Sequence, residues 1–480
     1  MFVNEMPYYE ILSEDAMAVL ERGWKRIVSE LGIEFRHPDA VNALRRAGQK
    51  VDGSVVKLDP EFVLEHVAKA PPYFDLRAPN PDRTVRIGGR SMAFLPVYGC
   101  PFTREGGQRR EATMADYERF VKLSHVFPEI DMAGGTLVEP NDRPLDSRHL
   151  DMLLALMTLS DKPFMGSVTS GPNAADTIAM AEILFGGREV IEEIPVVLSI
   201  INVNSPLCFD ERMLAAMLEY TRAGQPVIVT PFLLMGAMSP VSIPAALVQQ
   251  TAEALAGVAL IQLLRPGCPV VLGSFLSNID MQSGSPMFGT PESAIGLYAG
   301  GQLARRYRLP WRSGGGGLTA SQTVDAQAAY EALMTMLPAF LSGANVIMHA
   351  AGWLESGLVS CFEKYVVDIE ILRMLVSAFT PLDISEESLA FSAHQEVGHG
   401  GHFLGAAHTL ARFRDCFYRP LLSSSQNYER WMRSGAEDAT ARASNIWQVK
   451  LAAWEPPPLD AAIRDELSGY VAKRRQELGD

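Results

Sequence analysis

The sequence predicts an α/β protein built as a (β/α)₈ TIM barrel, with a helical segment before the barrel and an extension after it. Apolar runs of strand length alternate with helical patterns along most of the chain, which is typical of βα units and a parallel sheet. Eight such runs match the strand number and total length of a barrel. The predicted strands are residues 92–99, 132–139, 163–170, 196–204, 226–234, 269–277, 310–315 and 344–352.

Three segments follow from these patterns. Residues 1–90 form a helical N-terminal subdomain that begins with a helix capped by Ser13 and ends in a hairpin-like element. Residues 91–380 form the predicted barrel. Residues 381–480 lose the alternation, and we expect them to pack on the barrel or to form a subunit interface of a homo-oligomer. Both alternatives apply to the tryptophans of this extension, Trp431, Trp447 and Trp454.

Composition and charge narrow the class of protein. The chain has 480 residues, 48% of them hydrophobic, and a formal net charge of −14. This negative charge argues against nucleic acid or an anionic membrane as a partner, and it suits a cationic small molecule or simple solubility. Five cysteines, an odd number without a CxxC pair, indicate a reducing compartment. The first residues lack the features of a signal peptide, so we expect a cytoplasmic protein.

The most informative stretch is residues 310–365. A strand leads into four consecutive glycines, Gly314, Gly315, Gly316 and Gly317. Glycines at a strand end let a ligand approach the backbone closely, although a tight turn alone would also require them. No phosphate-binding or dinucleotide-binding motif accompanies the run. We therefore interpret it as room for a bulky cofactor or a methylated cation.

The next predicted strand ends at His349 and is followed by Trp353 and Glu355. Barrels carry their chemistry at the carboxyl ends of strands, which favours a cavity position for His349 over an ordinary core position. Aromatic faces bind quaternary ammonium ions through cation–π attraction. Trp353 is the first candidate for such a cage, and each further candidate wall has core packing as its alternative. Those further walls are Tyr98, Phe102, Phe275 and Tyr330.

A glycine-rich loop near the C-terminus carries several histidines. Zinc sites need Cys or His at tight spacing in a framed fold, and no HExxH pattern is present. We expect no tightly bound metal, but a flexible lid and a metal site both remain open for these residues. They are His394, His399, His402 and His408.

Three blocks of sequence resemble one known family. They are SGGGG…DAQAAYE…GANVIMHAAGWLESGLVSCFEKYVVDIEIL, YGCPFTREGGQRREATMADYERFVKL and GHGGHFLGAAHTLARFRDCFYRP. Over nearly the whole chain these motifs resemble the trimethylamine methyltransferase superfamily. The resemblance implies a (β/α)₈ barrel that moves a methyl group from a methylated amine to the cobalt of a corrinoid (cobalamin-type) cofactor, usually carried by a cognate corrinoid protein. The chain has ordinary residues throughout, so it is similar to the non-pyrrolysine branch, whose members act on quaternary amines such as glycine betaine.

The resemblance assigns roles to residues already singled out. Cobalt(I) is a strong nucleophile, so the protein must mainly orient the substrate and exclude water. His349 and Glu355 are the candidate catalytic residues, and Gly314–Gly317 leave room for the corrin. His349, Arg312 and the backbone N–H groups of residues 315–318 are candidates to bind a substrate carboxylate. A surface or structural charge is the alternative role for Arg312. The remaining candidates position substrate or line the mouth of the site: Gln327 and Asn202.

Other functions are compatible with the same residues. A metal-dependent lyase or an aldolase would need clustered carboxylates or a Schiff-base lysine at strand ends, where lysines are scarce. A non-catalytic betaine-binding or sensing protein would keep the aromatic cage without a corrinoid partner. Demethylation of trimethylamine itself is a third alternative.

Overall fold

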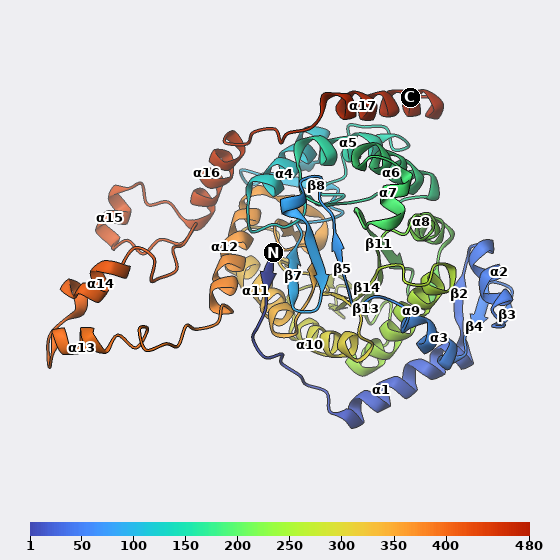
Figure 1. Ribbon diagram of the computed structural model, residues 1–480, viewed down its shortest axis with the longest axis horizontal. Coiled ribbons are helices and arrows are strands. Elements are labelled where there is room, and N and C mark those ends of the chain that lie inside the picture. The colour runs from blue at the N-terminus through green and yellow to red at the C-terminus, as the bar shows by residue number, and fades with distance from the viewer.

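The computed structural model describes residues 1–480 as a mixed α/β fold in which helices surround a central sheet (Figure 1). Seven neighbouring strands of this sheet run parallel. In their order across the sheet they are β10 (Phe164–Met165), β11 (Val197–Val203), β13 (Val227–Met235), β14 (Val270–Gly273), β17 (Trp311–Arg312), β18 (Val346–Ile347) and β7 (Ser91–Phe94). The helices that surround them are α4 (Met114–Val126), α5 (Arg148–Leu159), α6 (Gly171–Phe185), α8 (Glu211–Arg222), α9 (Ile243–Leu264), α10 (Pro291–Arg306), α11 (Ala326–Leu341) and α12 (Phe362–Ala378).

Seven of the eight predicted strands are confirmed in place, and the strand predicted at residues 132–139 is wrong. That segment forms only isolated bridges, one of them between Gly134 and Phe164 of β10. Gly134 has a φ of 105°, which lies outside strand geometry and interrupts the ladder. The segment nevertheless connects the first and last strands of the parallel run. It bridges to β10 through Gly134, and the N–H of Asp131 donates to the carbonyl of Phe94 in β7 at 2.9 Å.

Alternate side chains of the parallel strands point to one common interior, as the two-residue period of a strand requires. This interior is apolar at the level of Ile200, Ile228 and Val271. The hairpin of β5 (Tyr73–Leu76) and β6 (Val85–Gly88) joins the sheet beside β7 and adds its own apolar side chains to the same buried cluster. The hairpin predicted within residues 1–90 therefore contributes to the central core.

The N-terminal helices form where the sequence predicts them. α1 (Glu14–Arg26) begins at Ser13, whose Oγ accepts the N–H of Ala16 at 3.2 Å, and a π-helical turn then leads to Gly32. α2 (Pro38–Arg46) and α3 (Pro60–Val67) flank a small sheet of β2 (Ile33–Phe35), β3 (Lys50–Asp52), β4 (Val55–Lys57) and β12 (Cys208–Phe209). One helix, α9, is long and apolar enough to cross a membrane, and 83% of its most apolar stretch is buried inside the fold.

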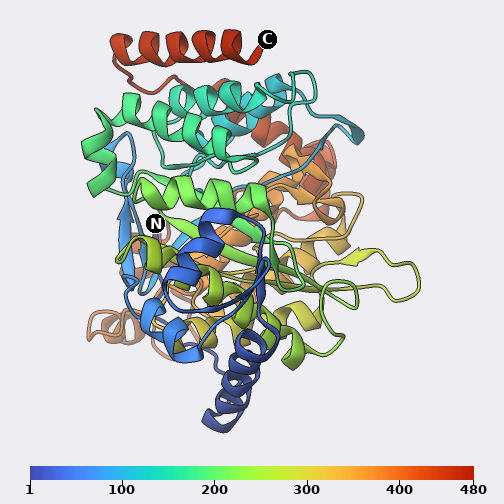
Figure 2. The same ribbon diagram turned by 90° about the vertical axis from the view of Figure 1, so that its right-hand side faces the viewer.

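The last two helices of the C-terminal extension pack against the helices that surround the central sheet. α16 (Ala439–Ala452) packs on α12 and α4, and α17 (Ala461–Leu478) lies along α5 and α6 at one edge of the molecule (Figures 1 and 2). Trp447 stacks on Phe362 at 4.8 Å between ring centres, and the indole N–H of Trp454 donates to the carbonyl of Leu159 at 3.2 Å. These two tryptophans therefore dock on their own chain.

The close approach of α10 to the strand that precedes the glycine run gives a first prediction. A Cβ at Gly301 would lie 2.5 Å from the carbonyl oxygen of Ser342 and 3.0 Å from the ring of Trp311. We expect Gly301→Ala to lower the free energy of unfolding by about 1–3 kcal/mol, because the backbone must shift. The matched variant Gly469→Ala lies on α17 with no atom within 4 Å of its new Cβ, and it should instead raise stability by about 0.5–1 kcal/mol. Urea unfolding measures both, and equal losses would contradict the packing argument.

Candidate active site

Arg312 carries a positive charge into the interior of the fold. In β17 the indole of Trp311 turns outward, where it donates to Ser274 Oγ at 3.0 Å, so the next side chain points inward. The Arg312 side chain is 2% exposed, and its guanidinium carbon lies 5.6 Å from the ring centre of Phe275. One guanidinium nitrogen donates to the carbonyl of Ser274 at 3.0 Å, and a second faces His349 Nε2 at 3.4 Å.

No carboxylate pairs with this guanidinium, and its Nε has no hydrogen-bond partner. Burial lowers the pKa of Arg312 to about 9. A buried charge ordinarily comes with a counter-ion, because an unpaired one is costly to remove from water. Arg312 is therefore the place in this interior where an anion would be stabilised most.

His349 lies beside Arg312 with its own unsatisfied atom. Burial, and then the neighbouring guanidinium, hold its pKa well below the usual value, so the imidazole is neutral at pH 7. Because arginine can only donate, the Nε2 that faces it carries the lone pair, and this geometry assigns the proton to Nδ1. Nδ1 is buried without a partner, which leaves a free N–H donor. The residue has a φ of 56°, and β18 ends at Ile347, two residues before His349.

Four aromatic side chains lie next to these two polar groups. Phe232 stacks on Phe275 at 4.4 Å between ring centres, and Phe288 meets Phe275 edge-on at 5.6 Å. Trp353 packs edge-on against Phe288 at 5.5 Å and against His349 at 4.3 Å. We call Phe232, Phe275, Phe288 and Trp353 the aromatic cluster. Its ring faces can hold a cation beside an anion bound at Arg312.

The glycine run is closely packed by protein atoms. Added Cβ atoms would lie 2.6 Å from Met336 at Gly316 and 2.7 Å from the carboxylate of Asp368 at Gly317. At Gly314 the nearest atom is 3.4 Å away, which is ordinary contact. Backbone packing against the following helices therefore accounts for Gly316 and Gly317. Space for a ligand at the remaining part of the run stays a prediction.

A buried ion pair joins this loop to the segment after His349. Lys364 Nζ pairs with the carboxylate of Asp368 and donates to the carbonyl of Gly317 at 3.1 Å. The Asp368 carboxylate also accepts the N–H of Gly352 at 2.9 Å. The pair thereby fixes the glycine run and the segment between His349 and Trp353 relative to each other.

The structure places the Glu355 carboxylate between two arginines. Its carboxylate pairs with Arg109 at 3.0 Å and with Arg104 at 3.6 Å, both from the hairpin of β8 (Phe102–Glu105) and β9 (Gln108–Glu111). Phe102 packs under the guanidinium of Arg109 at 4.0 Å. These contacts give Glu355 a role in holding the hairpin over the end of β19 (Trp353–Leu354).

The other predicted residues are only partly brought together. Phe275 and Trp353 join the aromatic cluster, whereas Tyr330 is 61% exposed on α11 and contacts none of its rings. Gln327, on the same helix, donates to Glu331 at 3.0 Å. Asn202 lies exposed near the end of β11, in register with Thr230 of β13. Tyr98 is half-buried beside Gly135, and burial raises its pKa to about 12.

Several members of the site were not singled out from the sequence. Phe232 shares the inward period of its strand with Thr230 and Ile228, so periodicity was a usable signal for it. Phe288 lies in a loop and Asp368 on a helix far along the chain, and nothing in their local sequence indicates the contacts they make.

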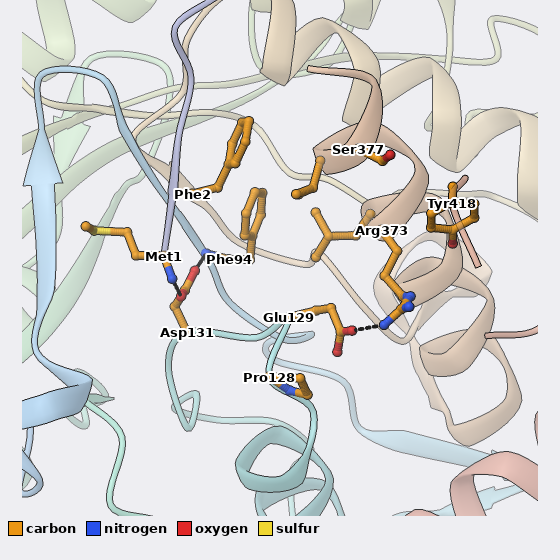
Figure 3. A pocket seen from close by; sticks show the side chains of 11 residues that line it. Met1, Phe2, Phe94, Pro128, Glu129, Asp131, Arg373, Ser377 and Tyr418 are labelled. Atoms are coloured by element: carbon orange, nitrogen blue, oxygen red, sulfur yellow. Dashed lines mark hydrogen bonds and ion pairs between the residues drawn. The ribbon is translucent and has the colours of Figure 1, made fainter. Parts of the chain in front are cut away.

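A cavity of about 380 Å³ lies elsewhere, beside the C-terminal half of α12 (Figure 3). Phe94 and Tyr418 are among its lining residues, and Glu129 pairs with Arg373 at its edge at 2.5 Å. The cavity shares no residue with the aromatic cluster or with Arg312, so it is separate from the candidate site.

The structure does not bring the histidines of the C-terminal loop together in one cluster. No group of three or more His, Cys, Asp or Glu side chains in residues 1–480 is placed to hold a metal ion. His394 packs edge-on against Phe403 at 5.4 Å between ring centres. The metal alternative for this loop gains no support, and the lid alternative stays a prediction.

The buried pair that links the two loops gives a second prediction. Asp368→Asn leaves the Lys364 ammonium buried without its counter-charge, so we expect the free energy of unfolding to fall by about 3–5 kcal/mol at pH 7. Glu30→Gln, which breaks a solvent-exposed helix pair with Arg26, serves as the matched control and should leave the urea midpoint unchanged. A similar midpoint for both variants would show that the buried pair does not hold the loops together.

Comparisons with known proteins place the chain in a family. The sequence profile of the trimethylamine methyltransferase (MTTB) family matches residues 1–479. Glycine betaine methyltransferase of Desulfitobacterium hafniense strain Y51 is 43% identical over 476 residues, which cover 99% of each chain. Proline betaine:corrinoid methyltransferase of Eubacterium limosum is 26% identical over 98% of this chain and 99% of its own.

The fold also resembles a solved structure. The crystal structure of the hydroxylamine MtmB complex superposes with a TM-score of 0.54 at 12% sequence identity, covering 95% of this chain and 91% of that one. At this identity the likeness concerns the fold alone. The full-length profile match and the 43% identical relative decide the family: this chain belongs to the trimethylamine methyltransferase family.

Proposed function

We propose that this protein is a corrinoid-dependent methyltransferase that demethylates a quaternary amine carrying a carboxylate, with glycine betaine as the first candidate. The observation that carries the proposal is Arg312, a buried charge without a counter-ion beside four aromatic rings. Glycine betaine brings a carboxylate and a trimethylammonium group in one small molecule. The 43% identity to a glycine betaine methyltransferase supports the same substrate.

Different residues would bind the carboxylate end and the ammonium end of such a substrate. The guanidinium of Arg312 and the free Nδ1–H of His349 would donate to the carboxylate, since charge-assisted hydrogen bonds of this kind are short and strong. The aromatic cluster would surround the ammonium group with ring faces. Because both ends of the substrate would be held in this way, one N–CH₃ bond would point toward the carboxyl ends of the strands.

The chemistry needs no acid or base from the protein. The corrinoid acts as the second substrate, and its Co(I) supplies the electron pair that bonds to the methyl carbon. The pair of the broken C–N bond stays on nitrogen, and dimethylglycine leaves as a tertiary amine. The protein contributes by alignment and by excluding water, which can lower a barrier by about 7–11 kcal/mol.

We propose further that the acceptor is delivered by a separate corrinoid protein at the carboxyl ends of a (β/α)₈ barrel. The segment at residues 131–134, which bonds to β7 and bridges to β10, would complete the ring of parallel strands. Asn202 and the half-buried Phe232 lie on the accessible side of the site, where a corrin would approach. Ordinary contact distances at Gly314 leave this part of the rim compatible with a close ligand.

A methyl-transfer assay tests the proposal. We expect methylcobalamin absorbance to grow when reduced cob(I)alamin and glycine betaine are supplied, and not with trimethylamine, which has no anion for Arg312. Proline betaine, carnitine, butyrobetaine and choline complete the substrate series. Calorimetric binding of a betaine without transfer to either free or protein-bound corrinoid would favour the sensing alternative, and turnover of trimethylamine alone would overturn the substrate assignment.

Replacement of Arg312 gives a third prediction. Arg312→Met removes the donor to the carboxylate, and we expect kcat/KM for glycine betaine to fall about 10- to 150-fold, as for a lost hydrogen bond to a charged group. Binding of tetramethylammonium, which lacks a carboxylate, should change little and serves as the control. A loss of equal size for both cations would show that Arg312 supports the fold rather than the carboxylate.

The pH dependence of the reaction gives a fourth prediction. Arg312 with a pKa of about 9 is charged below that pH and loses its charge above it. We expect kcat/KM for glycine betaine to stay level between about pH 6.5 and 8.5 and to fall above about pH 9, because glycine betaine itself does not titrate in this range. His349 is already neutral, so no inflection should occur near pH 6.5. An inflection there would contradict the assigned state of His349.

A further inference from the structure

Four neighbouring strands of the parallel sheet each place one residue at the same level of the interior as Arg312. In register, Asn202 of β11 pairs with Thr230 of β13, and Gly273 of β14 pairs with Arg312 of β17. Thr230 and Gly273 directly follow a registered pair of β13 and β14, so they also lie side by side. The level below them on the first three strands is the apolar one described above. Thr230 and Arg312 are therefore next-nearest neighbours with only a glycine between them.

Thr230 points into this interior with a hydroxyl that has no hydrogen-bond partner. It lies two residues from Ile228 of the apolar interior and two from Phe232 of the aromatic cluster, so the three side chains share one face of β13. Thr230 is 1% exposed, and its Oγ1 is left without a partner. Among the hydroxyl oxygens that are fully shielded from solvent, only that of Ser313 shares this property. A buried polar atom of this kind costs free energy, so it calls for an explanation.

Gly273 shows where the Thr230 hydroxyl lies. A Cβ added to Gly273 would stand 2.0 Å from Thr230 Oγ1. The hydroxyl therefore borders the space that a side chain of β14 would fill. Because glycine leaves that space free, no side chain of β14 separates the Thr230 hydroxyl from Arg312 on the next strand.

We propose that the Thr230 hydroxyl is a third donor to the carboxylate of the quaternary amine, which lies over Gly273. The inference rests on the proposed function and adds a specificity-determining residue to it. Thr230, Arg312 and His349 each have a buried polar atom without a partner. A carboxylate has enough lone pairs to accept from all three. The ammonium end of the same substrate would then lie toward Phe232, two residues further along β13.

Protein stability separates this binding role from a structural one. A structural hydroxyl donates within the protein, as Thr251 of α9 does to the carbonyl of Leu247 at 2.7 Å, and its removal lowers stability. Thr230→Val instead removes a polar atom that has no partner and leaves a side chain of similar size. We expect the urea midpoint of Thr230→Val to stay level or rise, and that of Thr251→Val to fall.

Calorimetric binding to the 480-residue chain tests the inference without a corrinoid. We expect Thr230→Val to raise Kd for glycine betaine about 10- to 150-fold, as for a lost hydrogen bond to a charged group. Kd for tetramethylammonium, which has no carboxylate, should not change. Thr230→Ser keeps the hydroxyl and should bind glycine betaine as the wild type does. Thr251→Val, a buried threonine on an outer helix, is the matched control and should leave both constants unchanged.

The outcomes distinguish this inference from the proposed function. Wild-type affinity of Thr230→Val for glycine betaine would overturn the role of Thr230 and leave the proposed function standing. An equal loss of affinity for both cations, together with a lower urea midpoint, would assign Thr230 to the fold and overturn the inference as well. A wild-type protein that binds tetramethylammonium and no carboxylated quaternary amine would overturn the proposed substrate, and the inference with it.

Discussion

The site depends on one buried positive charge that the protein itself does not neutralise. Removing an ion from water costs several kcal/mol, and Arg312 is compensated only by the carbonyl of Ser274, the lone pair of His349 and the ring of Phe275. This arrangement is stable because strand β17 is held from outside by the packing of Trp311. Under our proposal a carboxylated substrate supplies the missing counter-charge, so that binding offsets the free-energy cost of burying Arg312.

The surrounding structure holds the partners of this charge in a fixed geometry. His349 has a positive φ, a conformation that costs a non-glycine residue about 1–3 kcal/mol and persists only when neighbouring contacts enforce it. Those contacts come from the N–H groups of Gly316 and Gly317, which donate to the carbonyls of Met348 and His349. The Lys364–Asp368 pair adds to them, because its ammonium donates to the carbonyl of Gly317 and its carboxylate accepts the N–H of Gly352. The glycines thus permit close packing behind the site.

The sequence predicted the fold better than it predicted the contacts within the site. Apolar runs and caps located the long strands and the first helices, because periodicity and capping are local properties. The strand expected at residues 132–139 failed because Gly134 interrupts it. The arginine pairs of Glu355 and the exposure of Tyr330 likewise could not be predicted from local sequence. Phe288 and Asp368 reach the site only through tertiary folding, which no local pattern records. Arg312 was named as a candidate for the substrate carboxylate only once the family resemblance implied such a substrate, and its lack of a counter-ion appeared only in three dimensions.

The most direct test of the central claim is a crystal structure of the protein with glycine betaine bound. The distance to measure joins the substrate carboxylate to the guanidinium of Arg312. Our account predicts a hydrogen-bonded contact of about 2.7–2.9 Å, with the trimethylammonium group against the aromatic cluster. A carboxylate turned to solvent, with Arg312 still bonded only to Ser274 and His349, would contradict it.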